Sequence, residues 1–167
     1  MDFYSRDLKD TDINDINELH SLPEVTQYQT WDVQSYEDTE RFIKKVLDKD
    51  SHWIYNVIVN PDTDKVIGTF QLLIDEANNS AEIGYIVHPK YWNHGIATDM
   101  VATIVKYGFK VLKLNRIWGA MDSQNIAARI VLQKAGMEHE AVLRQDTLLK
   151  DGSYRDTLIF GILKSEY

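Results

Sequence analysis

One segment of the sequence, residues 82–98, most strongly limits what this chain can fold into. It reads Glu-Ile-Gly-Tyr-Ile-Val-His-Pro-Lys-Tyr-Trp-Asn-His-Gly-Ile-Ala-Thr. Its apolar start, Glu82–Val87, predicts a short strand, and the residues after Gly95 have the apolar spacing of a long helix. The pattern therefore predicts a strand, a turn and a helix in direct succession.

The N-terminus of this predicted helix is suited to binding an anion. The first N–H groups of a helix have no acceptor within the helix and carry partial positive charge. Gly95 and Ala97 keep bulky side chains away from these groups, so a phosphate can approach the main chain. The segment lacks the three glycines of a dinucleotide fingerprint and the Gly-Lys-Ser/Thr ending of a triphosphate loop. An ordinary glycine turn is the alternative interpretation, because a single glycine in a turn is common.

Composition sets the broad class of protein. The chain has 167 residues, of which 44% are hydrophobic and 26% charged, and it has no cysteine. We therefore expect a single globular domain over residues 1–167, without disulfides or thiolate chemistry. The five histidines lack the spacing of a helical zinc motif, so we expect no metal site. No apolar run has the length of a membrane span and the first residues do not resemble a signal peptide, so we expect a cytoplasmic protein without a membrane partner.

The charge balance bears on the choice of partner. The net charge is −8, which makes free nucleic acid a poor partner, because such binding depends on basic patches. An acidic surface favours cationic ligands, amines included. The alternative is that the charge serves only to keep the protein soluble.

The rest of the chain alternates between helical and extended patterns. Ser35 and Asp38 have the spacing of a capping box, and Asp151-Gly152 is a common hairpin turn. Thr11-Asp12 offers a cap for the first helix, and Ser123 or Asn125 for the last. Strands are expected at 3–8, 53–59, 66–74, 82–87, 116–121, 141–149 and 157–163, with helices after residues 12, 35, 95 and 125. This order predicts an α+β domain with one layer of strands and helices on both faces.

Three separated motifs share their order and spacing with a known family. The motifs are Glu82–Val87 with Tyr91–Thr98, then Asn115–Ile117 with Asn125–Arg129 and Gln133–Met137, and finally Tyr154–Thr157. Together they resemble the GNAT N-acetyltransferase superfamily, and within it the RimJ/RimL-like branch of ribosomal-protein N-terminal acetyltransferases. The resemblance extends over nearly the whole chain. It implies a GNAT fold, in which a single mixed, mostly antiparallel sheet is splayed and has helices on both faces.

The resemblance implies an activity. It is the transfer of an acetyl group from acetyl-CoA to a primary amine, by direct attack in a ternary complex. The branch points to a protein N-terminus as the acceptor, and a polyamine or another small amine is the alternative. A different class of function also stays open, namely an acyl-CoA-binding regulatory protein with little turnover. The sequence leaves the oligomeric state open, a homodimer included.

The resemblance also implies an acetyl-CoA site. The pyrophosphate would bind the N–H groups of residues 94 to 98, and the pantetheine arm would lie along the strand that ends at Val87. An N–H near Val87 would polarise the acetyl carbonyl. His94 replaces the lysine usual in the branch, and its charge titrates near neutral pH. The implied residues are Ile86, Val87, His94, Gly95, Ile96, Ala97, Thr98, Asn125, Arg129 and Lys134, the last two being candidates for the 3′-phosphate.

Glu82 is the candidate general base, because the amine must lose a proton and burial at the end of a strand would raise a carboxyl pKa. A strand-end carboxylate that faces water is the alternative. Asn125 would hydrogen-bond the pantetheine arm. The branch usually has a serine where this chain has Ala128, and other members have a tyrosine where it has Leu132. Both familiar proton donors to the CoA thiolate are therefore missing, which leaves water, Ser123 or another tyrosine.

The acceptor pocket is expected to involve three aromatic residues, Tyr28, Trp31 and Tyr36. Aromatic faces suit a cation or an apolar side chain, although core packing is their commoner use. Asp156 could steer a positively charged substrate, or it could be structural. The sequence does not identify which amine is acetylated.

Overall fold

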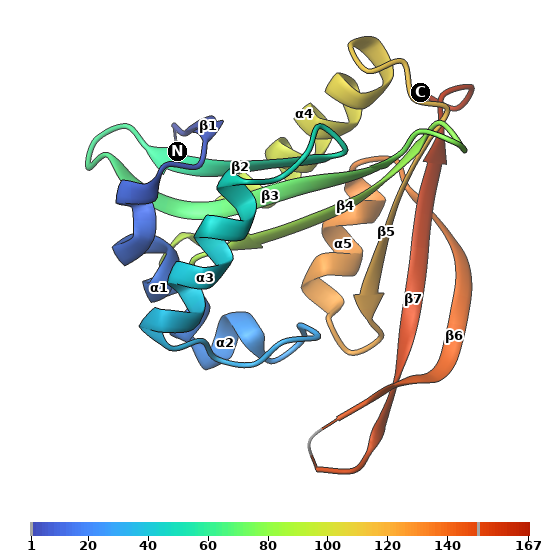
Figure 1. Ribbon diagram of the computed structural model, residues 1–167. Coiled ribbons are helices and arrows are strands. Elements are labelled where there is room, and N and C mark those ends of the chain that lie inside the picture. The colour runs from blue at the N-terminus through green and yellow to red at the C-terminus, as the bar shows by residue number, and fades with distance from the viewer. Residues whose placement is uncertain (1, 150) are drawn as a thin grey trace. The chain divides into compact units, whose positions relative to one another are not determined.

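The computed structural model describes residues 2–149 and 151–167. Hydrogen-bonded strands follow the order β1-β2-β3-β4-β5-β7-β6 (Figure 1). The strands are β1 (Tyr4–Asp7), β2 (Trp53–Asn60), β3 (Lys65–Asp75), β4 (Ser80–Val87), β5 (Arg116–Asp122), β6 (Glu138–Leu148) and β7 (Tyr154–Leu163). The helices are α1 (Ile13–Ser21), α2 (Pro23–Thr26), α3 (Tyr36–Leu47), α4 (Ile96–Lys110) and α5 (Ile126–Lys134), with 3-10 turns η1 (Asp10–Asp12) and η2 (Pro89–Tyr91).

The strand directions confirm the mixed, mostly antiparallel sheet. The pairs β1–β2, β2–β3, β5–β7 and β6–β7 are antiparallel, whereas β4 and β5 are parallel. The expected α+β class is therefore correct. The chain forms two compact units, one of Met1–Leu73 with Tyr85–Ile96 and the other of Ile74–Gly84 with Ala97–Tyr167.

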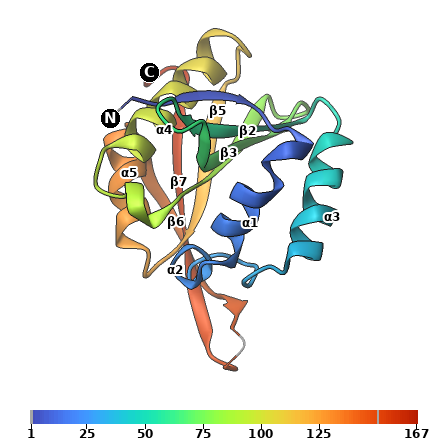
Figure 2. The ribbon, with the colours of Figure 1, turned by 90° about the vertical axis from the view of Figure 1, so that its left-hand side faces the viewer.

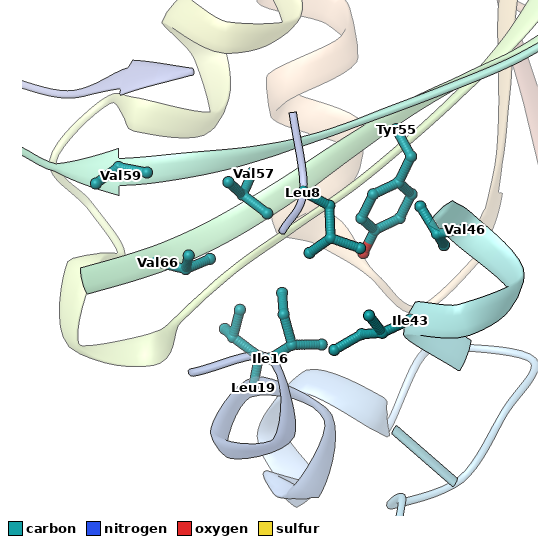
Figure 3. Packing of buried hydrophobic residues seen from close by; sticks show 9 residues of the cluster. All are labelled: Leu8, Ile16, Leu19, Ile43, Val46, Tyr55, Val57, Val59 and Val66. Atoms are coloured by element: carbon teal, nitrogen blue, oxygen red, sulfur yellow. The ribbon is translucent and has the colours of Figure 1, made fainter. Parts of the chain in front are cut away.

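The first unit is built around an apolar core beneath two helices. Helices α1 and α3 lie side by side over one face of β2 and β3 (Figures 1 and 2). Ile16 and Leu19 of α1 are fully buried, and they point toward Val57 of β2 (Figure 3). Burial of such aliphatic side chains supplies most of the stability of a small domain. The buried residues of this cluster are Leu8, Ile16, Leu19, Ile43, Val46, Tyr55, Val57, Val59 and Val66.

The start of the first unit departs in two ways from expectation. Helix α1 follows Asp12 as expected, but the Asp12 carboxylate does not cap it. Instead, Asp12 accepts the Lys9 N–H at 2.8 Å and pairs with Arg6 at 2.7 Å, because η1 turns its side chain away from α1. The sequence also gave no sign of α2, where proline at the first helical position starts a new turn after Leu22. The capping box of α3 is confirmed, since Ser35 accepts the Asp38 N–H and Asp38 accepts the Ser35 N–H.

The second unit contains α4 from Ala97 onward, β5, α5 and the long hairpin of β6 and β7 (Figure 1). Asn125 caps α5 as expected, through a 3.0 Å hydrogen bond from the Ala128 N–H to Oδ1. Gly136 follows that helix with φ of 86°, a left-handed conformation that ends a helix at low cost for glycine. Within the described part of the chain, no helix is both long enough and apolar enough to cross a membrane.

Candidate active site

The turn before α4 lies where the sequence predicts it. Gly95 has φ of 80°, and Asn93 has φ of 64°, a region that asparagine tolerates better than most residues. His94 and Gly95 are exposed, and α4 begins directly at Ile96. The turn thus ends where the N–H groups of the first helical turn begin. Binding of a phosphate by residues 94 to 98 stays a prediction.

Strand β4 loses its parallel partner partway along its length. Its register with β5 ends at Glu82, opposite Trp118. Further along, the His88 N–H donates to the carbonyl of Ile67 in β3 at 2.8 Å. Because successive residues of a strand direct their N–H groups to opposite sides, the N–H of Val87 points away from β3.

A second contact agrees with this orientation. The Val87 carbonyl accepts the indole N–H of Trp92 at 2.6 Å, so it is engaged by a side chain rather than by a neighbouring strand. Trp92 itself is 42% exposed. The end of β4 therefore has main-chain groups directed away from β3, which is the orientation that a ligand running along the strand requires.

The two faces of β4 carry different chemistry. Ile86 packs against the core cluster under α1 and α3. Side chains alternate between the faces of a strand, so Glu82 shares the face of Ile86, whereas Tyr85 and Val87 lie on the other face. Glu82, the candidate base, thus lies on one side of the strand, and the side chains of Tyr85 and Val87 lie on the other.

Glu82 has the environment expected of a tuned carboxyl group. Its side chain is half-buried and has no hydrogen bond or ion pair among the residues that the structure describes. Burial raises the pKa of Glu82, because the charged form loses hydration that no partner replaces. A carboxyl group with a raised pKa is a better proton acceptor, so Glu82 has the properties of a general base.

The residues of α5 have clear local roles. The Oδ1 atom of Asn125 is occupied by the helix cap, which leaves its amide N–H groups for another acceptor. Ala128 has no side-chain donor, and Leu132 is buried in the apolar interior. Arg129 and Lys134 are exposed and form no ion pair within the described chain. The structure thus offers no proton donor at either familiar position.

The three predicted acceptor residues all belong to the first unit. Trp31 is half-buried and packs against the ring of His20 at 4.8 Å between centroids, and His20 in turn lies 5.1 Å from Phe42. Tyr28 is half-buried, and Tyr36, the first residue of α3, is 50% exposed. Trp31 therefore packs against His20, while Tyr36 presents an exposed ring, and a role of these three residues in the acceptor pocket stays a prediction.

Asp156, in the second unit, takes part in two hydrogen bonds. Its Oδ1 accepts the N–H of Gln145 at 2.8 Å, and its carbonyl accepts the N–H of Ser123 at 3.0 Å. Gln145 has φ of 52° at an irregularity in the β6–β7 register. The carboxylate of Asp156 thus stabilises an irregular position in β6, and a role in steering a positively charged substrate stays a prediction.

Sequence reasoning missed three residues, namely His20, which contacts the predicted acceptor residue Trp31, and Tyr85 and Trp92 in and after β4. His20 is buried against aromatic rings, and burial lowers its pKa to about 4. The hydroxyl of Tyr85 is buried without a hydrogen-bond partner in the described chain. Only the polar hydroxyl of Tyr85 among apolar neighbours in β4 was a visible signal, because contacts between distant residues leave no trace in one sequence.

Comparison with known proteins agrees with this geometry. The family model described as an acetyltransferase (GNAT) domain matches residues 4–138. The chain is 32% identical to the N-acetyltransferase YoaA of Bacillus subtilis (strain 168), over 95% of this chain and 92% of that protein. It is 26% identical to the spermidine N(1)-acetyltransferase of Escherichia coli (strain K12), over 97% of this chain and 86% of the other.

The fold is also found among solved structures. The spermidine N-acetyltransferase of Vibrio cholerae, solved in complex with CoA and spermine, superposes with a TM-score of 0.87 at 23% identity, over 99% of this chain and 97% of the other. The chain therefore belongs to the GNAT family of acetyltransferases, and it is an acyltransferase enzyme. Enzymes of this family take their acetyl group from acetyl-CoA.

Proposed function

We propose that this enzyme acetylates a primary amine by direct attack of the amine on acetyl-CoA, with Glu82 as the general base. The observation that carries the proposal is the half-buried carboxyl group of Glu82, which has no partner among residues 2–149 and 151–167 and whose pKa burial raises. It lies at the point where β4 and β5 stop pairing. An unpaired buried carboxyl group is costly for a fold, so its retention is more readily explained by chemistry than by stability.

The main chain would hold and polarise the acetyl donor. The N–H groups of residues 94 to 98 would bind the pyrophosphate, since the turn at Gly95 presents a helix N-terminus without a large side chain. The N–H of Val87 points away from β3 and would donate to the thioester carbonyl. The free amide N–H groups of Asn125 would donate to a pantetheine carbonyl, and the exposed Arg129 and Lys134 would reach the 3′-phosphate.

The reaction then needs one proton acceptor. The neutral amine attacks the acetyl carbon, a C–N bond forms, and the C–S bond breaks to release the CoA thiolate. The nitrogen loses a proton to Glu82, directly or through one water. Since Glu82 shares a strand face with Ile86, the amine would approach from that face of β4.

Two classes of acceptor deserve separate tests. A protein N-terminus is the acceptor implied by the resemblance to the RimJ/RimL-like branch. A polyamine is favoured by the net charge of −8 and by the likeness to spermidine acetyltransferases over nearly the whole chain. CoA release measured with peptides that have free N-termini, with spermidine and spermine, and with N-acetylated peptides as a blank would separate the two classes.

Replacement of the base tests the mechanism. Glu82→Gln keeps the size of the side chain but removes its basicity, so we expect kcat to fall by roughly 10²–10⁴-fold while acetyl-CoA still binds. Glu138→Gln is the matched control, because Glu138 is an exposed carboxylate on β6. A Glu82→Gln enzyme with kcat within about threefold of the wild type would refute the role of Glu82.

Replacement of the turn glycine tests the phosphate site. Gly95→Val places a branched side chain at a position with φ of 80°, in front of the α4 N-terminus, and should nearly abolish acetyl-CoA binding in calorimetry. Gly152→Val is the control for backbone strain, because Gly152 has φ of 83° and no atom within 4 Å of its added Cβ. Both variants should lose some stability, but only Gly95→Val should lose the ligand. Equal affinity in both would contradict the site.

A further inference from the structure

The hydroxyl of Tyr85 is a buried polar group without a partner. It is the one buried side-chain nitrogen or oxygen that lacks a hydrogen bond within residues 2–149 and 151–167. Desolvation of such a group without a new hydrogen bond is unfavourable. The other deeply buried tyrosine, Tyr55, bonds to Thr69 instead. Tyr85 is therefore an exception that calls for an explanation.

The position of Tyr85 connects it to the proposed donor site. It is two residues before Val87 on the same strand and on the same face, and the proposed base Glu82 is on the opposite face. The Val87 N–H is the group that would polarise the thioester carbonyl. The Tyr85 side chain lies on the same face as Val87 and is close to Val87 along the strand. It is therefore placed to meet the leaving CoA thiolate rather than the attacking amine.

Neither familiar donor for this leaving group is present in the chain. Breaking of the C–S bond places negative charge on sulfur, and a hydrogen bond to that sulfur stabilises it. Ala128 and Leu132, at the two positions where the family resemblance implies a donor, cannot supply the bond. A tyrosine hydroxyl that has no other partner in the described chain can supply this hydrogen bond to the sulfur.

We infer that the Tyr85 hydroxyl donates a hydrogen bond to the sulfur of CoA as the thiolate leaves. The inference rests on the proposed function. Tyr85 keeps its own proton, because burial raises its pKa and so disfavours the phenolate. The Tyr85 side chain as a whole is half-buried, so a small rotation of the ring can present the hydroxyl to a ligand lying along β4.

A thermodynamic cycle, in which two protein variants are each measured with two ligands, tests whether the Tyr85 hydroxyl contacts the sulfur of CoA. Calorimetry would give the affinities of the wild type and of Tyr85→Phe for CoA and for desulfo-CoA, which has hydrogen in place of the thiol. We expect the wild type to prefer CoA by about fivefold or more, and Tyr85→Phe to lose this preference. Turnover by Tyr85→Phe should fall by roughly 10–10²-fold with acetyl-CoA affinity little changed.

The cycle contains its own controls. Tyr55→Phe also removes a buried phenol hydroxyl, but in the core cluster, so it should keep the preference for CoA over desulfo-CoA. The ultraviolet absorbance of the thiolate, followed against pH, gives the pKa of CoA bound to the wild type, a readout that needs no variant. We expect that pKa to lie below the value for free CoA.

Three results would overturn the inference. They are an unchanged preference for CoA in Tyr85→Phe, an equal loss of affinity for both ligands, and a thiol pKa in the complex equal to that of free CoA. Failure of the wild type to bind either CoA or acetyl-CoA would instead refute the proposed function as a whole.

Discussion

At the scale of single residues, the first unit buries a titratable ring that no charge stabilises. His20 is 4% exposed and lies against Trp31 and Phe42, and burial lowers its pKa from 6.5 to about 4. The unfolded chain therefore takes up a proton at a higher pH than the folded chain. Stability is complete above the unfolded pKa and falls as the pH drops from about 7 toward 4, by up to roughly 3 kcal/mol.

This pH dependence can be separated from that of the carboxyl groups. Urea unfolding of the wild type and of His20→Gln between pH 4 and pH 7 would give two curves of free energy against pH. His20→Gln is expected to be less stable at pH 7 but to have a shallower slope, because the substituted side chain cannot be protonated. Parallel curves would show that the pKa of His20 is the same in the folded and the unfolded chain.

At the scale of elements, two helices begin with N-cap residues whose contributions can be compared directly. Ser35 caps α3 and Asn125 caps α5, each through a hydrogen bond from the third residue of the helix. Replacement of either by alanine should lower the free energy of unfolding by about 1 kcal/mol. Only Asn125→Ala should also weaken acetyl-CoA binding in calorimetry, since Asn125 is proposed to contact the pantetheine arm. Equal ligand affinity in the two variants would leave Asn125 as a cap alone.

At the scale of the whole molecule, the net charge of −8 should act on the two substrates in opposite directions. A polyamine is attracted to an acidic protein, and salt screens that attraction, so KM for spermidine should rise by about threefold or more between low and high ionic strength. Acetyl-CoA is an anion and is repelled, so its KM should fall or stay constant. A KM for spermidine that does not respond to salt, in an enzyme that uses it, would show that the charge has no part in recognition.

The sequence by itself determined the local structure of this protein. The capping box at Ser35, the glycine turn at Gly95 and the cap at Asn125 were all predicted, because each depends on residues within one turn of each other. The missed α2 is a single turn, too short to produce a periodic pattern. The motifs around residues 82–98 likewise pointed to the family, since their spacing is fixed along the chain.

Only the tertiary structure decided which of these side chains have partners. Asp12 was expected to cap α1, but Arg6 engages it from β1, and Asp156 is engaged by Gln145 across a hairpin. The close approach of β3 and β4, where a Cβ on Gly68 would lie 2.6 Å from the Ile86 carbonyl, also has no local signal.

The same holds for the groups that carry the proposals. Glu82 and Tyr85 are three residues apart in one strand, yet their exposure and their lack of hydrogen bonds depend on which distant elements cover them. Hydrogen bonding and burial are sums over neighbours in space, and a single sequence records neighbours only along the chain. The sequence therefore predicted which residues could react. The fold determined that, among the described residues, the Glu82 carboxyl has no partner and the Tyr85 hydroxyl has no acceptor.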